Sequence, residues 1–247
     1  MRFVLYNIRY GTGSGPGFHW PVPFSGYFRR TRKNLASITS FLKAKEPDLV
    51  GLIEVDNGSY RSKKSCQAAL IAKELGFDHV YRSKYPRSSF AQNVPVLRDQ
   101  GNAFLTNLHI EDHGFHLFRN GIKRMVLELE FQAFTVFLVH LSLKYRHRQY
   151  QLRELYTLFA EVKGPVIVAG DFNAFWGNKE LDLFLAATGL LNANRDGDAT
   201  FPSDNPRRQL DFILHSPSLK VTNFQISTVQ LSDHLPLVCD FEISEKA

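Results

Sequence analysis

The feature that most constrains this chain is a series of short, continuous apolar runs that lead into polar residues. Residues 166–169 read Val-Ile-Val-Ala and continue directly into Gly-Asp-Phe-Asn. Continuous apolar runs of this length are typical of strands that are buried on both faces. Comparable runs begin near residues 2, 48, 101, 124, 134, 208, 220 and 235. We therefore expect buried β-sheet at the centre of the fold.

Helical patterns lie between some of these runs, whereas other runs follow one another directly. Residues 31–44 place Leu35, Ile38 and Leu42 on one face of a helix. Further helices are expected over residues 65–75, 146–162 and 179–187. Because several consecutive strands have no helix between them, the sheets should be mixed rather than purely parallel. No composition break or short repeat divides the chain, so we expect a single domain over residues 1–247.

Composition narrows the class of protein and of partner. The 247 residues are 44% hydrophobic and 22% charged, which suits a globular core without disulfide bonds. The net charge of +6 favours an anionic partner, namely a phosphate ester, a nucleic acid or an anionic membrane face. The two cysteines lie far apart in sequence, which favours a reducing compartment. With no signal-like segment and no membrane-spanning run, we expect a monomeric, cytoplasmic protein.

Several of the apolar runs carry, at or near one end, a residue that can bind a metal ion or a phosphate. These residues are Asn7, Glu54, His140, Asp171, Asn173, Asp211, Asp233 and His234. Each alone has an ordinary structural interpretation, because Asp forms turns, Glu lies on surfaces and His fills cores with hydrogen-bond partners. A buried carboxylate is costly unless it is paired or bound to metal. Together, these residues predict a site for a hard cation with acid–base groups beside it.

The motifs GDFN and SDH, with the upstream Glu of LIEV, resemble those of the endonuclease/exonuclease/phosphatase superfamily. The resemblance runs from YNIR to SDHLPLV and includes QGNAFLT and RRQLDFIL. That superfamily includes pancreatic-type deoxyribonuclease, apurinic endonucleases, neutral sphingomyelinases and inositol-polyphosphate phosphatases. The resemblance implies a four-layer α/β sandwich, in which two mixed sheets pack face to face and the site lies at one edge.

On the metal side, the resemblance implies that Glu54 is the principal ligand of Mg²⁺, or of Mn²⁺ in its place. Asn7 and Asp233 would support the same side of the site. One position departs from the pattern of apurinic endonucleases, which carry an acidic residue two positions after the first Asn, where this chain has Arg9. In this respect the NIR sequence resembles the deoxyribonucleases.

The resemblance also implies catalytic roles. Asp171 and Asn173 would orient the attacking water and hold a phosphate oxygen. His140 would contact phosphate or donate a proton. His234, oriented by Asp211, would act as an acid–base group. Whether Asp171 or His234 is the base stays open at this point, and so does the partner of His140.

These residues suit in-line attack of water on phosphorus, so we expect a phosphodiesterase that acts on nucleic acid or on a phospholipid head group. The basic segments 60–65 and 144–149 either line the phosphate entrance or form solvated surface. The glycine- and proline-rich loop over residues 11–28 either closes over a substrate or packs on the body. The alternatives are a non-catalytic phosphate- or nucleic-acid-binding protein and a structural module whose polar residues only cap strands.

Overall fold

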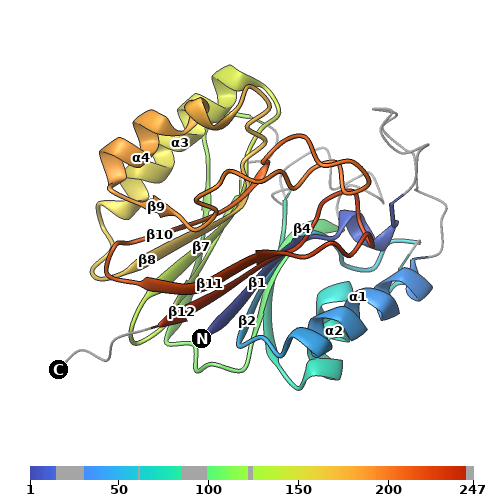
Figure 1. The fold of residues 1–247 in the computed structure, drawn as a ribbon. Coiled ribbons are helices and arrows are strands. Elements are labelled where there is room, and N and C mark those ends of the chain that lie inside the picture. Colours follow the sequence, from blue (N-terminus) through green and yellow to red (C-terminus); the bar gives the residue numbers. More distant parts are fainter. Residues whose placement is uncertain (15–30, 61, 85–98, 122–124, 243–247) are drawn as a thin grey trace.

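Two mixed sheets of six strands pack face to face, and helices cover their outer faces (Figure 1). The computed structural model describes residues 1–14, 31–60, 62–84, 99–121 and 125–242. This arrangement is the four-layer α/β sandwich implied by the motifs, and that prediction is confirmed. Most of the loop over residues 11–28, and Arg61 of the first basic segment, lie outside the described residues.

The first sheet has the strand order β11-β12-β1-β2-β4-β3. The strands are β1 (Arg2–Asn7), β2 (Leu49–Asp56), β3 (Asp78–Ser83), β4 (Gln100–Thr106), β11 (Lys220–Ile226) and β12 (Leu237–Glu242). β1 and β2 run parallel, and the other neighbours are antiparallel. The helices α1 (Arg32–Lys45) and α2 (Gln67–Leu75) cover its outer face (Figure 1). A short 3-10 helix, η1 (Arg9–Gly11), follows β1.

The second sheet has the order β5-β6-β7-β8-β10-β9. Its strands are β5 (Asp112–Leu117), β6 (Met125–Glu130), β7 (Thr135–His140), β8 (Val166–Asp171), β9 (Leu191–Asn192) and β10 (Asp211–His215). β7 and β8 run parallel. The helices α3 (Tyr145–Phe159) and α4 (Asp182–Thr188) lie on its outer face, and the 3-10 helix η3 (Asn178–Glu180) precedes α4 (Figure 1).

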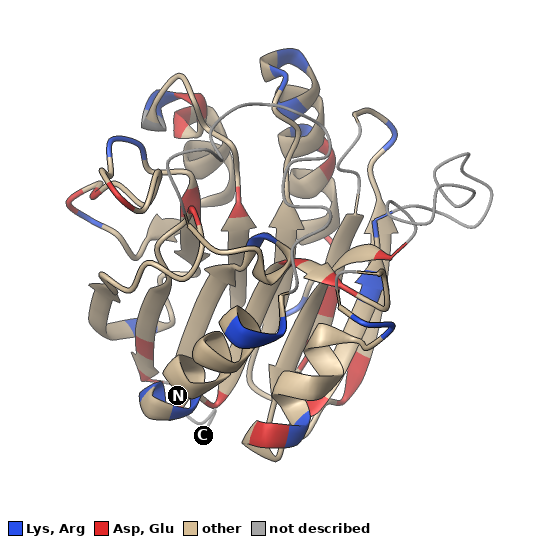
Figure 2. Cartoon of the chain, turned by 90° about the vertical axis from the view of Figure 1, so that its right-hand side faces the viewer, with Lys and Arg blue, Asp and Glu red and all other residues tan. Residues whose placement is uncertain are grey.

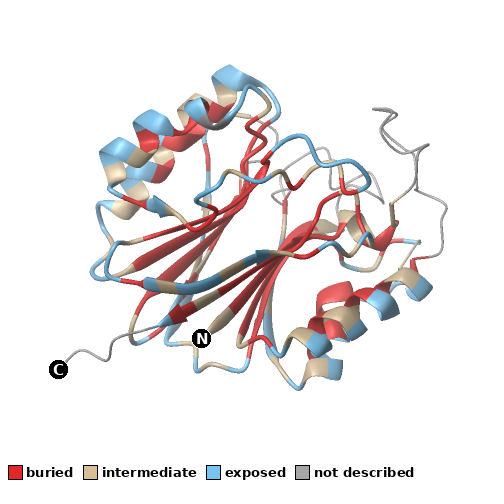
Figure 3. Cartoon of the chain, viewed as in Figure 1, coloured by how far each residue is buried: buried red, intermediate tan, exposed pale blue. Residues whose placement is uncertain are grey.

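The main core fills the space between the two sheets (Figure 3). Phe3 and Phe104 of the first sheet pack in one cluster with Leu138 and Ile213 of the second. Gly51 allows a close approach here, because a Cβ at this position would lie 3.1 Å from Leu138 Cδ1. Separate apolar clusters lie under each helix layer. The central strands are therefore buried on both faces, as their continuous apolar runs predict.

Helix predictions agree closely with the structure. Leu35, Ile38 and Leu42 are the buried residues of α1, and Gly76 ends α2 in a left-handed conformation. The edge strand β5 was not predicted, because its residues are exposed or half-buried and mostly polar. Within the described part of the chain, every helix is too short or too polar to cross a membrane.

Candidate functional site

The strand topology brings the predicted site residues to one edge of the sandwich. Asn7 is the last residue of β1. Its register partner on β2 is Ile53, and Glu54 follows Ile53 directly. His140 ends β7 directly beside Asp171, the last residue of β8. Parallel neighbours finish at the same edge of a sheet, so each sheet delivers two of these residues there. Asp211 joins them because it pairs with Asp171 across β8 and β10.

Asp171 is the centre of the first cluster. Its Oδ2 atom accepts a hydrogen bond from Asn7 Nδ2 at 3.2 Å and lies 3.2 Å from His140 Nε2. Its Oδ1 atom accepts the backbone N–H of Asn173 at 3.0 Å. The structure thus supplies a partner for His140 that the sequence left open. Asn7 and Asp171 belong to different sheets, so this hydrogen bond joins the two sheets at their edge.

The backbone conformation explains why the GDFN motif has glycine at position 170 and asparagine at position 173. A Cβ at Gly170 would collide with the carbonyl oxygen of Val139, so only glycine fits this close strand pair. Asn173 adopts a left-handed conformation, with φ of 50°, which Asn tolerates better than most residues. Its side-chain Nδ2 donates to the Leu141 carbonyl at 2.9 Å. The Asn173 side chain is therefore fixed to the loop that follows His140.

A second cluster contains Asp211 and His234. Asp211 Oδ2 lies 2.7 Å from His234 Nδ1 and accepts the Thr200 hydroxyl, also at 2.7 Å. Burial alone would lower the pKa of His234, but the charge of Asp211 and the hydrogen bond to it raise that pKa to about 10. Burial raises the pKa of Asp211, and His234 opposes the rise. Because His234 precedes β12 and Asp211 begins β10, this pair also joins the two sheets.

Glu54 and Asp233 each lie near a basic side chain. Lys84 Nζ is 3.7 Å from Glu54 Oε1, and Arg9 Nη1 is 3.4 Å from Asp233 Oδ2. Glu54 has a φ of 58° where the register of β2 shifts. Left-handed backbone is unusual for Glu, and such strain is concentrated at functional sites.

The donor chemistry on the metal side fits a hard cation. Among the described residues, no group of three or more His, Cys, Asp or Glu side chains is arranged to hold a metal ion. Mg²⁺ does not need such a group, because it keeps several waters and binds through one or two carboxylates and substrate oxygens. The Glu54 side chain is 18% exposed and lies next to the end of β1, where Asn7 presents an amide. Glu54 and Asn7 thus offer oxygen donors, and both sulfur ligands, Cys66 and Cys239, lie elsewhere as free thiols.

Sequence reasoning missed three residues that support this edge. Thr200 is fully buried on Asp211, and Lys84 is 5% exposed beside Glu54. Arg9 was seen only as a departure from a motif. None of the three shows a local signal, because each contact joins segments that are distant in sequence.

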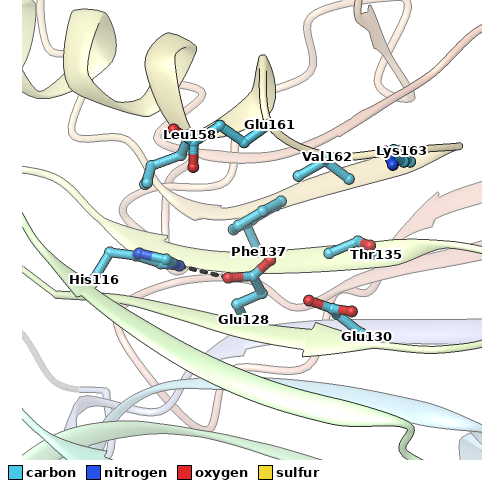
Figure 4. Close-up of a pocket in the computed structure, with 9 residues that line it drawn as sticks. All are labelled: His116, Glu128, Glu130, Thr135, Phe137, Leu158, Glu161, Val162 and Lys163. Carbon is cyan, nitrogen blue, oxygen red and sulfur yellow. Dashed lines mark hydrogen bonds and ion pairs between the residues drawn. The ribbon is translucent and has the colours of Figure 1, made fainter.

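A cavity of about 400 Å³ lies elsewhere on the second sheet, at the opposite end of β7 from His140 (Figure 4). The side chains around it include Thr135, His116, Glu128, Glu130, Glu161 and Lys163. Three carboxylates against one lysine make this cavity unsuitable for an anion. The strand-end edge is therefore the better candidate for a phosphate site.

Known proteins resemble this chain in sequence and in fold. The profile of the Endonuclease/Exonuclease/phosphatase family matches residues 4–234. The uncharacterized protein YbhP of Escherichia coli K12 is 33% identical over 129 residues, which cover 49% of this chain and 51% of YbhP. The match therefore spans about half the length of this curated relative.

Two solved structures share the fold over nearly the whole chain. The mannosyl-6-phosphatase of Bacteroides thetaiotaomicron superposes with a TM-score of 0.73 and 16% identity, over 98% of this chain and 100% of that one. The human Nocturnin catalytic domain with bound sulfate superposes with a TM-score of 0.70 and 21% identity, over 99% and 94%. At these identities the likeness concerns the fold.

Proposed function

Because the chain belongs to the Endonuclease/Exonuclease/phosphatase family, we propose that it is a Mg²⁺-dependent hydrolase of phosphoric esters, and specifically a phosphodiesterase. Mn²⁺ is the expected alternative ion. The observation that carries the proposal is that two buried carboxylates, Asp171 and Asp211, each hold an imidazole at the edge where the sheets meet. The substrate would be a phosphodiester of nucleic acid or of a phospholipid head group.

The contacts of Asp171 and His234 suggest separate roles for these two residues in the attack of water on phosphorus. Asp171, held by Asn7 and by the backbone N–H of Asn173, can orient a water molecule and accept its proton. His234 is protonated at neutral pH when its pKa is about 10. It can therefore stabilise a phosphate oxygen or protonate the leaving group. We accordingly assign the base to Asp171 and the acid to His234.

The other residues complete the site. Asn173 can hold a phosphate oxygen without adding negative charge. His140, whose Nε2 lies 3.2 Å from Asp171 Oδ2, can also hold a phosphate oxygen. Glu54, with Asn7 and Asp233, would hold the cation. When bound, Mg²⁺ supplies electrostatic stabilisation of the negative charge on the phosphate. The proposal agrees with the basic surplus of the chain, which attracts anionic substrates.

The test is hydrolysis of bis(p-nitrophenyl) phosphate with Mg²⁺ or Mn²⁺. We expect Asp171→Asn and His234→Ala to lower kcat/KM by about 100-fold or more, since general acid–base groups contribute about 10²–10⁴-fold. His116→Ala, on the edge strand β5, is the control and should retain activity. Circular dichroism and thermal unfolding would show that each variant folds.

Two results would contradict the proposal in different ways. Full activity in both Asp171→Asn and His234→Ala would show that the site lies elsewhere. A folded wild type that binds phosphate but hydrolyses no ester with either metal would favour the alternative of a non-catalytic phosphate- or nucleic-acid-binding protein.

A further inference from the structure

We propose that a basic cavity beside this site binds a second phosphate group of the substrate. The cavity has a volume of about 720 Å³ and lies between the start of α1, the loop after β2 and α2. Figure 2 turns this side of the molecule toward the viewer, with Lys and Arg in blue. The inference rests on the proposed function, because it assigns a further group of the same substrate.

The described residues that line the cavity favour a ligand that has an anionic group attached to an uncharged part. The exposed cations are Arg32, Lys33 and Lys63. The residues with hydroxyls are Thr31, Ser62 and Ser65, and the apolar wall consists of Leu35, Ala36 and Leu70. No acidic side chain is among these lining residues. Guanidinium and ammonium donors match the oxygens of a phosphate. The apolar wall suits the part of an ester between its phosphates.

Hydrogen bonds tie this cavity to the strand-end edge. Asn34, in the first turn of α1, donates from Nδ2 to the carbonyl of Leu231 at 2.8 Å, two residues before Asp233. Helix α1 therefore begins next to the segment that carries Asp233 and His234. A cavity that opens at this helix start borders the same edge.

A second set of contacts leads from the cavity toward Glu54. Gln67 Nε2 donates to the Tyr10 carbonyl at 2.7 Å and lies 3.4 Å from the hydroxyl of Thr31, a lining residue. The Tyr10 hydroxyl in turn accepts a hydrogen bond from Lys84 Nζ at 3.0 Å. Lys84 contacts Glu54. A short series of contacts thus connects the cavity with the proposed metal ligand.

Hydrogen bonds to Asp56 hold the described residues next to Lys63 in place. Asp56, fully buried at the end of β2, accepts the backbone N–H of Ser59 at 2.8 Å and the hydroxyl of Ser62 at 2.7 Å. Lys63 follows with a φ of 54°. Because β2 also carries Glu54, one strand fixes both the proposed metal ligand and the wall of the cavity.

The ligand that fits is a molecule with at least two phosphates, one at the strand-end edge and one in the cavity. A simple ester with a single phosphate would leave the three cations without an anion. The carrier between the phosphates can be a nucleoside or a polyol, since the apolar wall contacts only its uncharged part. The experiment separates these two sources.

The kinetic test compares two esters that differ by one phosphate. These are the p-nitrophenyl ester of thymidine 5′-phosphate with and without a 3′-phosphate. We expect kcat/KM of the wild type to be higher by about tenfold for the 3′-phosphorylated ester, as for one charge-assisted hydrogen bond. Arg32→Gln and Lys63→Glu should remove this preference and leave the other ester unaffected. Lys43→Glu, at an exposed lysine at the far end of α1, has the same charge change as Lys63→Glu and is its control.

A binding test is independent of hydrolysis. Calorimetry would measure thymidine 3′,5′-bisphosphate and inositol 1,4-bisphosphate against their monophosphates, with wild type, Lys63→Glu and Lys43→Glu. Tighter binding of either bisphosphate, lost only in Lys63→Glu, supports the inference and identifies the carrier. Equal binding of mono- and bisphosphates, or equal loss in the control, overturns it. If no ester is hydrolysed but bisphosphate binding behaves as expected, the proposed function fails and the second phosphate site stands.

Discussion

At the scale of single residues, the site depends on two buried carboxylates, each of which contacts an imidazole and at least one further hydrogen-bond donor. Asp171 divides its two oxygens among an amide, an imidazole and a backbone N–H. Asp211 uses one oxygen for both Thr200 and His234. A buried carboxylate with such partners keeps its orientation, and so does the imidazole it contacts.

We predict that Asp211→Asn keeps the fold but impairs turnover. The amide can still accept from Thr200, but it cannot stabilise a charged His234, so the pKa of His234 should fall. We expect kcat to drop by about 100-fold, within the range for general acid–base groups. NMR titration of the His234 ring and steady-state kinetics would measure both effects. An unchanged His234 titration would contradict the pairing.

His215 gives a prediction on pH, away from the proposed site. Its ring is buried against Phe241, and Nδ1 lies 2.9 Å from the Ser216 carbonyl. Burial lowers the pKa of His215, so the unfolded chain binds the proton more readily than the fold does. The stabilisation by neutral His215 is therefore present above the unfolded pKa of about 6.5 and is lost as pH falls below it.

Urea unfolding between about pH 7 and about pH 5 would test this effect. We expect the free energy of unfolding of the wild type to fall over this range. The fall should be smaller in His215→Gln, which does not titrate. His113→Gln, an exposed histidine on β5, should behave like the wild type. Parallel pH curves for wild type and His215→Gln would contradict the assignment.

At the scale of elements, the loops after β7 and β8 are held by one buried ion pair. Arg148 of α3 is 1% exposed and donates to the carbonyls of Ser142 and Leu143 at 2.9 and 2.7 Å. Its Nε donates to Glu180 Oε2 at 2.9 Å, while Glu180 Oε1 accepts the backbone N–H of Trp176 at 2.7 Å. One arginine thus connects the segments that follow two strand ends of the proposed site.

We predict that Arg148→Met lowers the free energy of unfolding by about 3–5 kcal/mol, because it leaves Glu180 buried without its partner. The double variant Arg148→Met/Glu180→Leu should regain part of this loss, since no charge stays buried. Arg153→Met, exposed on the same helix, should have little effect. Urea unfolding of the wild type, Arg148→Met, Glu180→Leu and the double variant measures the coupling. Strictly additive changes would show that the pair does not act as a unit.

The elements also show what a sequence can predict. The apolar runs located the central strands because both of their faces are buried. The segment 144–149 was interpreted as entrance lining or as an exposed helix face, yet Arg148 is buried within it. Its partner Glu180 lies 32 residues further on, and helical periodicity alone does not show which turn faces that residue. Edge strands such as β5 also give weak signals in the sequence, because little of their surface is buried.

At the scale of the whole molecule, the motifs predicted which polar residues reach one edge of the sandwich but not the basic side chains beside Glu54 and Asp233. Parallel strands finish at one edge, so the polar residues after apolar runs converge through topology alone. The contacts Lys84 to Glu54 and Arg9 to Asp233 depend instead on how connections cross that edge. Such long-range pairs have no local pattern.

We predict that Mg²⁺ stabilises the whole fold through Glu54. A ligand that binds only the folded state adds about 2.7 kcal/mol at 100 times its Kd, so Tm should rise with Mg²⁺ concentration. Glu54→Gln should weaken this response, whereas Glu74→Gln, exposed on α2, should not. Thermal unfolding across a Mg²⁺ series would measure it. An identical rise in wild type and Glu54→Gln would exclude Glu54 as a principal ligand.

The two hydrogen bonds that join the sheets, Asn7 to Asp171 and Asp211 to His234, have a consequence for synthesis. Residue 7 leaves the ribosome early and residue 234 late, so no shorter nascent chain contains both hydrogen-bonded pairs. This edge of the two sheets can therefore close only after translation has passed His234.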